Sequence, residues 1–410
     1  MFCESRADAQ ALDARDPLAF ARSRFTLPDD VVYLDGNSLG ALPASVRSAV
    51  VDAIDRQWGR DLVGSWNGNG WWTLPRRVGD RIGALVGAAP GQVMCGDSTS
   101  VQLFQALTAA ARLRPGRRVL VTDGDGFPTD QYLADAVARI LDLRVRRVTP
   151  PGLAADEDTA VLALSAVDYR TGELWDVEAI TRSAHEAGAL VVWDLSHAAG
   201  ALPFDLDALG ADAAVGCGYK YLNGGPGSPA WLYLPHRHQA AADLPLTGWQ
   251  GRANPFGLAQ TYEPADGVER ARIGTPPVLS MLALEAALDV WDGVHLSDVR
   301  AKSLSLSDLL IARADGLRSC GVSVVTPRDH RRRGSHVSLR HEKAYELCQA
   351  LIGSGIVGDF RAPDLLRLAL TPLYLRHVDV WDAMDALAAI LETAAYEDPK
   401  YRRSEAATVT

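Results

Sequence analysis

The chain has 410 residues, of which 48% are hydrophobic and 22% charged, as in an ordinary soluble globular protein. Its formal net charge is −10 and its one basic run, Arg331–Arg333, is short, which argues against nucleic acid as the main partner and favours a solvated loop for the run. Because no apolar stretch reaches the ~20 residues of a membrane span and no apolar signal-peptide core stands near the start, we expect a cytoplasmic protein without membrane contact.

The five cysteines are odd in number and far apart, without a CxxC pair or a Cys/His cluster at metal-binding spacing. Neither a disulfide framework nor a metal site is therefore predicted. A chain of this length is expected to form a large domain and a smaller one. We expect an N-terminal segment over 1–50 that packs with the small domain, a large domain over 51–284, a small α+β domain over 285–395 and a polar tail over 396–410.

Strand and helix patterns alternate through the middle of the chain. The expected strands cover 118–122, 159–167, 189–194, 213–215 and 231–234, and the expected helices cover 101–113, 131–141 and 177–187. Asp176 is a candidate N-cap for the last of these helices, and Gly188 can close it. Apolar runs such as TAVLALSAV are typical of strands covered on both faces. The alternation predicts an open, mostly parallel sheet with helices on both faces.

The pattern changes after about residue 280. Helices are expected over 281–291, 300–317 and 344–355, and β-prone segments over 321–327, 334–341 and 365–370. This part of the chain is typical of a separate α+β unit. The predicted fold class is therefore α/β, with a second, smaller α+β domain.

Asp194 closes the apolar strand predicted over 189–194, and ligands of open α/β sheets bind at the carboxyl ends of strands. A carboxylate after the apolar run VVW is costly to bury unless it is paired, so one interpretation gives it a cationic partner. The other interpretation makes it an N-cap for the segment that follows. His197, three residues on, either lies beside the same ligand or holds the turn of the chain.

Lys220 lies between two tyrosines in the glycine-rich stretch GCGYKYLNGGPG, one crossover segment after Asp194. The two side chains therefore belong to neighbouring strand ends at one edge of the sheet. Desolvation lowers the pKa of a lysine, so that its amine can form a Schiff base with an aldehyde. The alternative is a solvated surface lysine in a flexible loop, and the nearby Asp194 favours the first interpretation. We expect five glycines of this stretch to let a flat ring come close to the backbone and to expose N–H groups to a phosphate, namely glycines 216, 218, 224, 225 and 227.

A lysine for an aldehyde and a carboxylate for a pyridinium nitrogen are two of the groups that pyridoxal 5′-phosphate (PLP) needs. N–H donors for its phosphate are the third. Thr99 and Ser100, in the run GDSTS, stand at the start of an apolar helical stretch, where free N–H groups and the helix dipole favour an anion. Simple capping is their other interpretation. Together the three features predict a PLP-binding enzyme.

At these residues the sequence resembles the kynureninase family, PLP enzymes of the aspartate aminotransferase fold related to class V aminotransferases. The resemblance rests on WDLSHAAGALPFDLDALGADAAVGCGYKYLNGGPGSPAWLYL and YLDGNSLG, with FPTD, LTGWQGR, RIGTPP and LLRLALTPLY, and spans residues 31–380. It implies the PLP-dependent transferase fold of type I, in which a large domain with a mostly parallel sheet flanked by helices is joined to a smaller α+β domain. It also implies a homodimer.

The resemblance further implies roles for individual residues. Lys220 would bond to the cofactor and carry the α-proton, Asp194 would pair with the pyridinium nitrogen, and Tyr219 would donate a proton. The other residues implied to contact the cofactor are Thr99, Ser100, Phe127, Pro128, Thr129, Asp130, Ser165, His197, Trp249 and Thr275. The residues implied to contact the substrate are Ser38, Trp66, Thr275 and Arg367, the last as a two-pronged clamp for the α-carboxylate.

The implied reaction is hydrolytic cleavage of the Cβ–Cγ bond of L-kynurenine to anthranilate and L-alanine in tryptophan catabolism. The 3-hydroxylated form of kynurenine is a second candidate substrate. Thr275 stands where family members specialised for that form carry asparagine, and Trp66 matches the bacterial pattern at the aryl pocket. Both residues favour plain kynurenine.

Other protein classes fit the sequence less well. A cysteine desulfurase of the same fold needs a mobile catalytic cysteine, and Cys320 and Cys348 lie in the appropriate half of the chain, although their apolar surroundings are typical of buried thiols. The GxGxxG, GxxxxGK[ST] and GxSxG patterns of nucleotide-binding proteins and serine hydrolases are absent. A non-catalytic protein on a PLP scaffold would not need both Asp194 and Lys220.

Overall fold

The computed structural model describes residues 3–149 and 155–403, which belong to two compact units. The small unit takes its described residues from 1–44, 167–174 and 290–410, and the large unit from 45–166 and 175–289. The large unit therefore begins at Ser45 instead of 51 and ends at Asp289 instead of 284. No feature of the sequence predicts that 167–174 belongs to the small unit. The part of the predicted polar tail after residue 403 lies outside the described residues.

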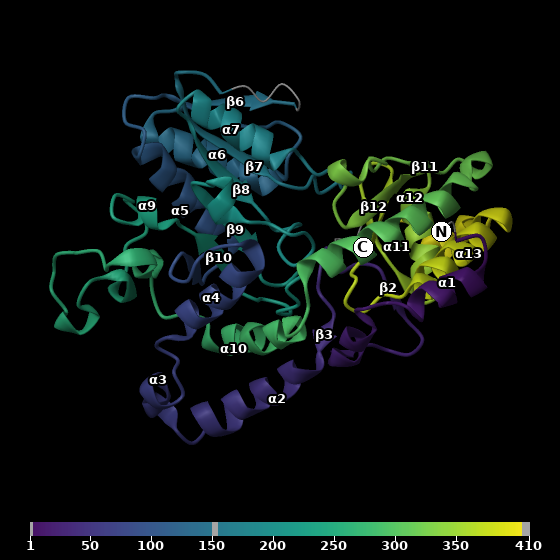
Figure 1. Ribbon diagram of the computed structural model, residues 1–410, viewed down its shortest axis with the longest axis horizontal. Helices are drawn as coiled ribbons and strands as arrows, with labels where there is room; N and C mark the ends of the chain where they lie inside the picture. Colours follow the sequence, from purple (N-terminus) through teal and green to yellow (C-terminus); the bar gives the residue numbers. More distant parts are fainter. Residues whose placement is uncertain (1–2, 150–154, 404–410) are drawn as a thin grey trace. The chain divides into compact units, whose positions relative to one another are not determined.

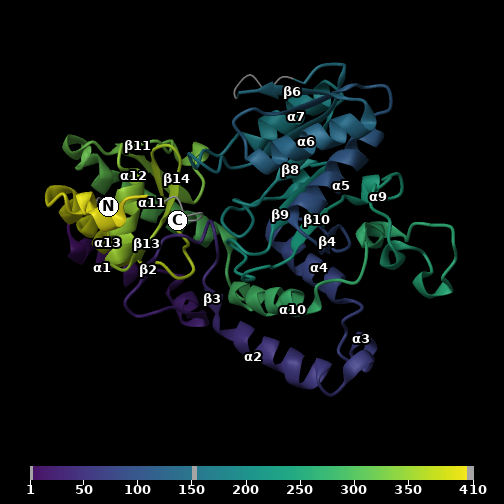
Figure 2. The same ribbon diagram turned by 180° about the vertical axis from the view of Figure 1, so that it is seen from behind.

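The large unit is built on a seven-stranded sheet in the order β4-β10-β9-β8-β7-β5-β6. Strands β5 to β9 run parallel to one another, while β10 is antiparallel to both β9 and β4. The mostly parallel sheet is thus confirmed, and its strands can be followed from opposite sides in Figures 1 and 2. The strands are β4 (Val93–Cys95), β5 (Val119–Asp123), β6 (Arg144–Val148), β7 (Thr159–Ser165), β8 (Leu190–Asp194), β9 (Ala213–Cys217) and β10 (Ala230–Tyr233).

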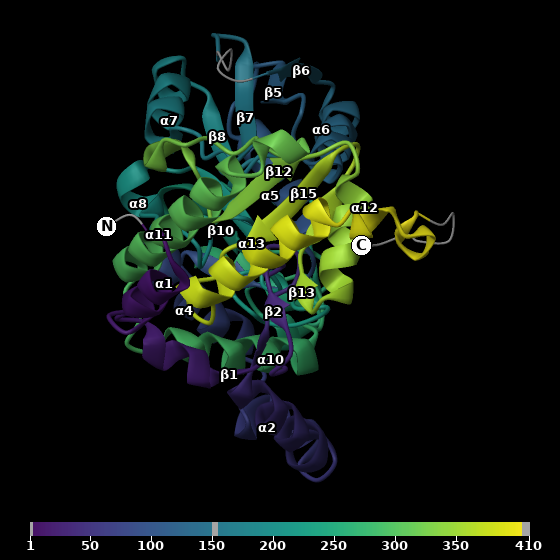
Figure 3. The ribbon, with the colours of Figure 1, turned by 90° about the vertical axis from the view of Figure 1, so that its right-hand side faces the viewer.

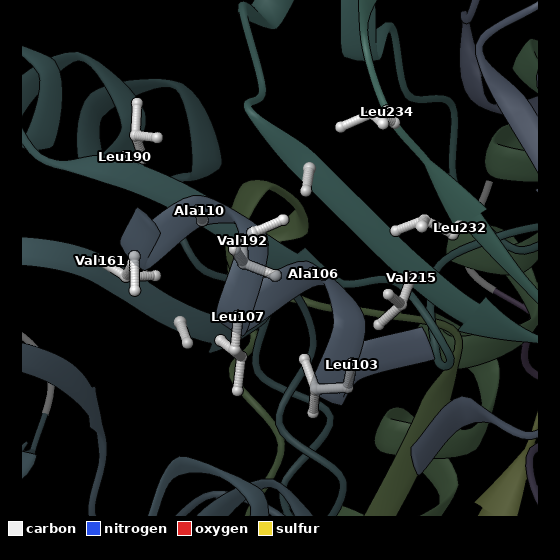
Figure 4. Close-up of a cluster of buried hydrophobic side chains, with 14 of the residues drawn as sticks. Leu103, Ala106, Leu107, Ala110, Val161, Leu190, Val192, Val215, Leu232 and Leu234 are labelled. Atoms are coloured by element: carbon white, nitrogen blue, oxygen red, sulfur yellow. The ribbon is translucent and has the colours of Figure 1, made fainter. Parts of the chain in front are cut away.

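Helices cover both faces of this sheet, as the alternating pattern predicts. Apolar side chains of α5 pack on one face against strand residues such as Val161, Val192 and Val215 (Figure 4). Successive strand residues point to opposite faces, so Trp193 faces the other way, and its indole Nε1 donates a hydrogen bond of 3.1 Å to Thr181 of α7. The helices are α2 (Ala44–Asp52), α3 (Ser65–Gly68), α4 (Leu74–Val86), α5 (Thr99–Arg112), α6 (Pro128–Leu141), α7 (Val177–Glu186), α8 (Leu206–Leu209), α9 (His236–Gln239) and α10 (Val278–Ala287).

Local signals fix several helix ends. The Asp176 carboxylate accepts a hydrogen bond of 2.9 Å from the Ala179 N–H, and Gly188 follows α7 with a φ of +78°, so both predicted ends are confirmed. Helix α6 begins at Pro128 instead of 131, because proline suits the first turn, where its missing N–H costs nothing. The helix expected over 281–291 ends at Ala287 and continues as a 3₁₀ turn.

Asp212, just before β9, connects three segments of the large unit. Its buried carboxylate accepts hydrogen bonds from His185 of α7 (2.7 Å), from His238 of α9 (2.8 Å) and from the Val191 N–H of β8 (2.9 Å). Burial by itself would raise the pKa of Asp212, but these hydrogen bonds lower it to about 2.

This pKa predicts a stability change in acid. In the unfolded chain the carboxyl has an ordinary pKa of about 3.9. Because the pKa is lower in the folded protein, Asp212 stabilises the fold above about pH 4 and loses this effect as the pH falls towards about 2. We expect Asp212→Asn to lower the free energy of unfolding by roughly 2 kcal/mol at pH 7. Urea unfolding between pH 7 and pH 2.5 should also show a flatter decline for the variant, and identical pH slopes in both proteins would contradict this assignment.

The small unit contains a four-stranded antiparallel sheet in the order β11-β12-β15-β14. The N-terminal segment packs within this unit: β2 pairs in parallel with β13, and α1 lies along α13 (Figure 3). The elements are α1 (Arg6–Asp13), β1 (Phe25–Thr26), β2 (Val32–Tyr33), β3 (Leu42–Pro43), α11 (Leu296–Asp315), β11 (Ser323–Val324), β12 (His336–Arg340), α12 (Ala344–Gly353), β13 (Ile356–Val357), β14 (Asp359–Arg361), β15 (Leu365–Ala369) and α13 (His377–Glu392). Among the described helices of both units, none has the length and apolar character to cross a bilayer.

Candidate active site

Three neighbouring strands of the large unit end at one edge of the sheet. Ser165 closes β7 and Asp194 closes β8, and the strand register places them side by side. The Ser165 hydroxyl donates to Asp194 Oδ2 at 3.3 Å, and Asp194 Oδ1 accepts from the Ser196 N–H at 2.8 Å. Asp194 thus holds a turn instead of capping a helix, and within 3–149 and 155–403 no side-chain cation forms an ion pair with it. This partly exposed edge therefore offers its negative charge to a cation from outside the chain.

Lys220 follows β9, the next strand in the sheet. Its amine nitrogen Nζ lies 2.9 Å from Nε2 of His197, which is itself buried after β8. The ring centroid of Tyr219 lies 6.0 Å from the same Nζ. Lys220 is only partly exposed and is hydrogen-bonded to a buried ring, so it is not a solvated surface lysine.

Packing explains part of the glycine-rich stretch around Lys220. A Cβ on Gly218 or Gly224 would collide with the Ser228 hydroxyl, and one on Gly216 would lie 2.6 Å from the Trp231 ring. These three glycines therefore serve close packing within the protein. Turns explain Gly225 and Gly227, whose φ angles are +82° and +74°.

Carboxyl groups gather at the same sheet edge. Asp123 at the end of β5 and Asp130 in the first turn of α6 line a cavity of about 10 Å³ together with Ser165 and Asp194. Burial, and next the negative charge of Asp194, raise the pKa of Asp130 well above its ordinary value, against smaller opposing effects from Lys220 and Ser165. A cationic group bound at this sheet edge would relieve the repulsion.

The first turn of α5 offers N–H groups to an anion. Ser98 is the N-cap, and its hydroxyl accepts from the Val101 N–H at 3.4 Å. Thr99 and Ser100 are the first two helical residues, so capping is not their role. Neither their N–H groups nor their hydroxyls are engaged by other residues of the described chain. They remain available for a phosphate, as predicted for a helix N-terminus.

Aromatic side chains form a second feature of the large unit. Trp249 opens the 3₁₀ turn η4 (Trp249–Gly251), is 40% exposed, and has its ring centroid 5.8 Å from that of Trp72. Trp66 lies in α3, with its ring 5.8 Å from Trp71. Phe127 is exposed just before α6, whose first turn carries Pro128, Thr129 and Asp130, and Thr275 is exposed before α10.

Arg367 and Ser38 come together in the small unit. Arg367 lies on β15, is 1% exposed, and donates through Nη2 to the Ser38 hydroxyl at 3.2 Å. Its guanidinium also forms a two-pronged ion pair with Asp359, directly opposite on β14, including a 2.7 Å bond from Nε to Oδ1. The remaining nitrogen, Nη1, donates to the Tyr169 carbonyl. The predicted carboxylate clamp is therefore already engaged by a carboxylate of the protein.

Sequence reasoning did not identify Asp359 as the partner of Arg367. It also did not single out three buried polar residues of the large unit, Gln102, Gln250 and Arg272. For Asp359 the available signal is the short hairpin DFRAPDLLRLA, in which opposite charges on facing strand positions pair. No group of three or more His, Cys, Asp or Glu side chains in the described part of the chain is arranged to hold a metal ion.

The large-unit residues fit PLP by their chemistry. The ring nitrogen of PLP is cationic when protonated and suits Asp194, its aldehyde suits the Lys220 amine, and its phosphate suits the start of α5. These three groups all belong to the carboxyl side of one sheet or to the helix that packs on it.

Known proteins resemble this chain over nearly its whole length. The family described as "Kynureninase C-terminal domain" matches residues 299–387. The kynureninase of Burkholderia pseudomallei (strain 1106a) is 45% identical over 99% of this chain and 100% of its own, and that of Deinococcus radiodurans is 50% identical over 94% of this chain and 96% of its own. Among solved structures, the cysteine desulfurase CsdA of Escherichia coli has a TM-score of 0.77 at 20% identity, covering 92% of this chain and 98% of its own. That of Thermococcus onnurineus NA1 has a TM-score of 0.76 at 17% identity, with the same coverage. The structural likeness confirms the predicted fold class.

Proposed function

Because the chain belongs to the kynureninase family, we propose that it hydrolyses the Cβ–Cγ bond of L-kynurenine to anthranilate and L-alanine with PLP as cofactor. One observation on the chain itself carries the proposal. At one sheet edge, the Asp194 carboxylate forms no ion pair with a side-chain cation of the described residues. Lys220 follows the next strand, and its amine is hydrogen-bonded to the buried His197 ring. The similarity to the relatives supports the choice of substrate, and the geometry of this sheet edge supports binding of the cofactor.

When bound, PLP supplies an electron sink for the carbon next to the substrate amine. Lys220 accepts and returns the proton of that carbon through Nζ, which His197 holds at 2.9 Å. When the cofactor is bound, the carboxylate charge of Asp194 would favour a proton on its ring nitrogen. Burial raises the pKa of Tyr219 above its ordinary value, so its phenol carries a proton at neutral pH. The family resemblance assigns to this phenol the protonation of the carbon left after cleavage.

The substrate contacts follow from the family resemblance. Arg367 and Ser38 are assigned to the α-carboxylate, and Trp66 and Thr275 to the aryl group. The hydrogen bond between Ser38 and Arg367 supports a shared role for the first two. With threonine instead of asparagine at 275, we propose a preference for kynurenine over its 3-hydroxylated form.

The assembly and location are parts of the same proposal. We propose a homodimer, supported by large apolar side chains that are exposed on the large unit, among them Trp58, Val63, Phe256 and Leu258. A cytoplasmic location is supported by the five cysteines, all of which are free thiols.

The test is product formation by the purified protein with PLP. Anthranilate fluorescence and alanine release are expected from L-kynurenine, a weaker signal from the 3-hydroxylated form, and no alanine from L-cysteine. Alanine from cysteine and none from kynurenine would instead identify a desulfurase. Against that outcome, burial raises the pKa of Cys348 to about 12, although Cys320 is partly exposed and not buried as expected.

A further inference from the structure

A cavity of about 20 Å³ lies beside the predicted phosphate site in the large unit. Among the residues that line it are three buried polar side chains: Gln102 in the first turns of α5, Gln250 in η4, and Arg272. They are 1%, 3% and 7% exposed, respectively. Each has one polar atom without a hydrogen-bond partner among the described residues, namely Gln102 Oε1, Gln250 Nε2 and Arg272 Nε. An unsatisfied buried polar group costs about 1–3 kcal/mol, so three around one cavity indicate a missing common partner.

The three atoms define the chemistry of that partner. Gln250 Nε2 and Arg272 Nε are donors, and Gln102 Oε1 is an acceptor. A water molecule accepts two hydrogen bonds and donates one or two, and a cavity of about this size holds a single water. A larger ligand would not fit.

The other polar atoms of these side chains form hydrogen bonds with the two segments of the predicted phosphate site, the segment at the start of α5 and the segment around Trp249. On one side, Gln102 Nε2 donates to the Gly96 carbonyl at 2.9 Å, which holds the loop that leads into Thr99 and Ser100. On the other side, Arg272 Nη2 donates to Gln250 Oε1 at 2.7 Å and to the Trp72 carbonyl at 3.0 Å. A shared water would therefore join the start of α5 to the segment that carries the aromatic residues.

Arg272 also controls the surroundings of Trp249. Its guanidinium lies 4.6 Å from the Trp72 ring centroid, and that ring packs against Trp249. Backbone contacts reinforce the link, because the Gln250 N–H donates to the Ile273 carbonyl at 3.4 Å and a Cβ on Gly251 would collide with the Arg272 carbonyl. A displacement of Arg272 would thus move the residue that the family resemblance assigns to the cofactor phosphate.

We propose that one buried water, bound by Gln102, Gln250 and Arg272, fixes the spacing between the first turn of α5 and Trp249 and so positions the phosphate-binding site. The three residues are positioning residues and do not take part in the chemistry. This inference rests on the proposed function, since it assumes that the phosphate of PLP binds at these two segments. Loss of this water should weaken binding of the phosphate group and leave binding of the rest of the cofactor unchanged.

The test compares PLP with pyridoxal, which lacks the phosphate. The full chain, freed of cofactor, is titrated with either compound, with tryptophan fluorescence as the readout. Gln102→Met and Gln250→Met are each expected to weaken PLP binding roughly tenfold and to leave pyridoxal binding within about twofold. Since both substitutions break one network, the double variant should bind PLP no more weakly than either single variant.

A matched control lies on the same helix. Gln105 is fully buried in α5 but does not line the cavity, so Gln105→Met should leave the affinity for PLP unchanged. Arg272→Lys retains the charge without the planar fork and should weaken PLP binding as the glutamine variants do. If Gln102→Met does not fold, Gln250→Met tests the same water from the opposite side.

The outcomes separate this inference from the proposed function. Equal losses for PLP and pyridoxal, or additive effects in the double variant, would overturn the water network while leaving a wild-type protein that binds PLP and cleaves kynurenine. A wild-type protein that binds no PLP would overturn the proposed function itself. A crystal structure with density for a water between the three side chains would support the network directly.

Discussion

Lys220→Ala is expected to abolish both turnover of L-kynurenine and covalent attachment of PLP. The proton transfers assigned to the Lys220 amine are alone worth roughly 10²–10⁴ in rate. The covalent bond through which Lys220 would hold the cofactor is lost as well, so the combined loss of rate should exceed this range. Turnover is measured by anthranilate fluorescence, and attachment by borohydride reduction followed by peptide mass spectrometry, which should find the cofactor on Lys220 of the wild-type protein.

Lys343 provides the control for this experiment. It is an exposed lysine at the start of α12 in the small unit, so Lys343→Ala removes the same charge without touching the sheet edge. This variant should retain activity and labelling at Lys220. An active Lys220→Ala protein, or wild-type protein labelled at another lysine, would refute the assignment.

Arg367→Ala is expected to reduce stability severely as well as to raise the KM for kynurenine. From the sequence, weaker substrate binding is the main expectation. The structure adds that Arg367 and Asp359 form an ion pair in which each side chain is 1% exposed. Removing the arginine leaves the Asp359 carboxylate buried without its main partner, and such losses cost about 3–5 kcal/mol. Urea unfolding of the wild-type and variant proteins measures this change.

Neighbouring residues separate the two effects. Arg361 also pairs with Asp359, at 2.8 Å, but its side chain is 36% exposed, so Arg361→Ala should cost less than about 1 kcal/mol. The double variant Arg367→Met/Asp359→Leu removes both charges and should recover much of the lost stability. If it regains stability but not substrate affinity, Arg367 binds substrate. An Arg367→Ala protein with unchanged stability and KM would exclude both roles.

The sequence by itself determined the features that depend on local pattern. Alternating apolar strands and helices predicted the mostly parallel sheet, and a carboxylate at the end of an apolar strand predicted the ligand-binding edge. Because carboxyl ends of parallel strands share one edge, the order Asp194 then Lys220 was enough to place both there. Helix-end signals at Asp176 and Gly188 worked for the same reason, since caps depend only on neighbouring residues.

Only the tertiary structure decided which distant side chains meet. The pairing of Arg367 with Asp359 depends on the register of a short hairpin, and a slip of one residue would turn Asp359 to the other face. The packing of Gly216 on Trp231 and the cavity shared by Gln102, Gln250 and Arg272 bring together residues from separate segments. Such contacts are set by how elements pack in three dimensions, and no periodicity or spacing along a single sequence records them.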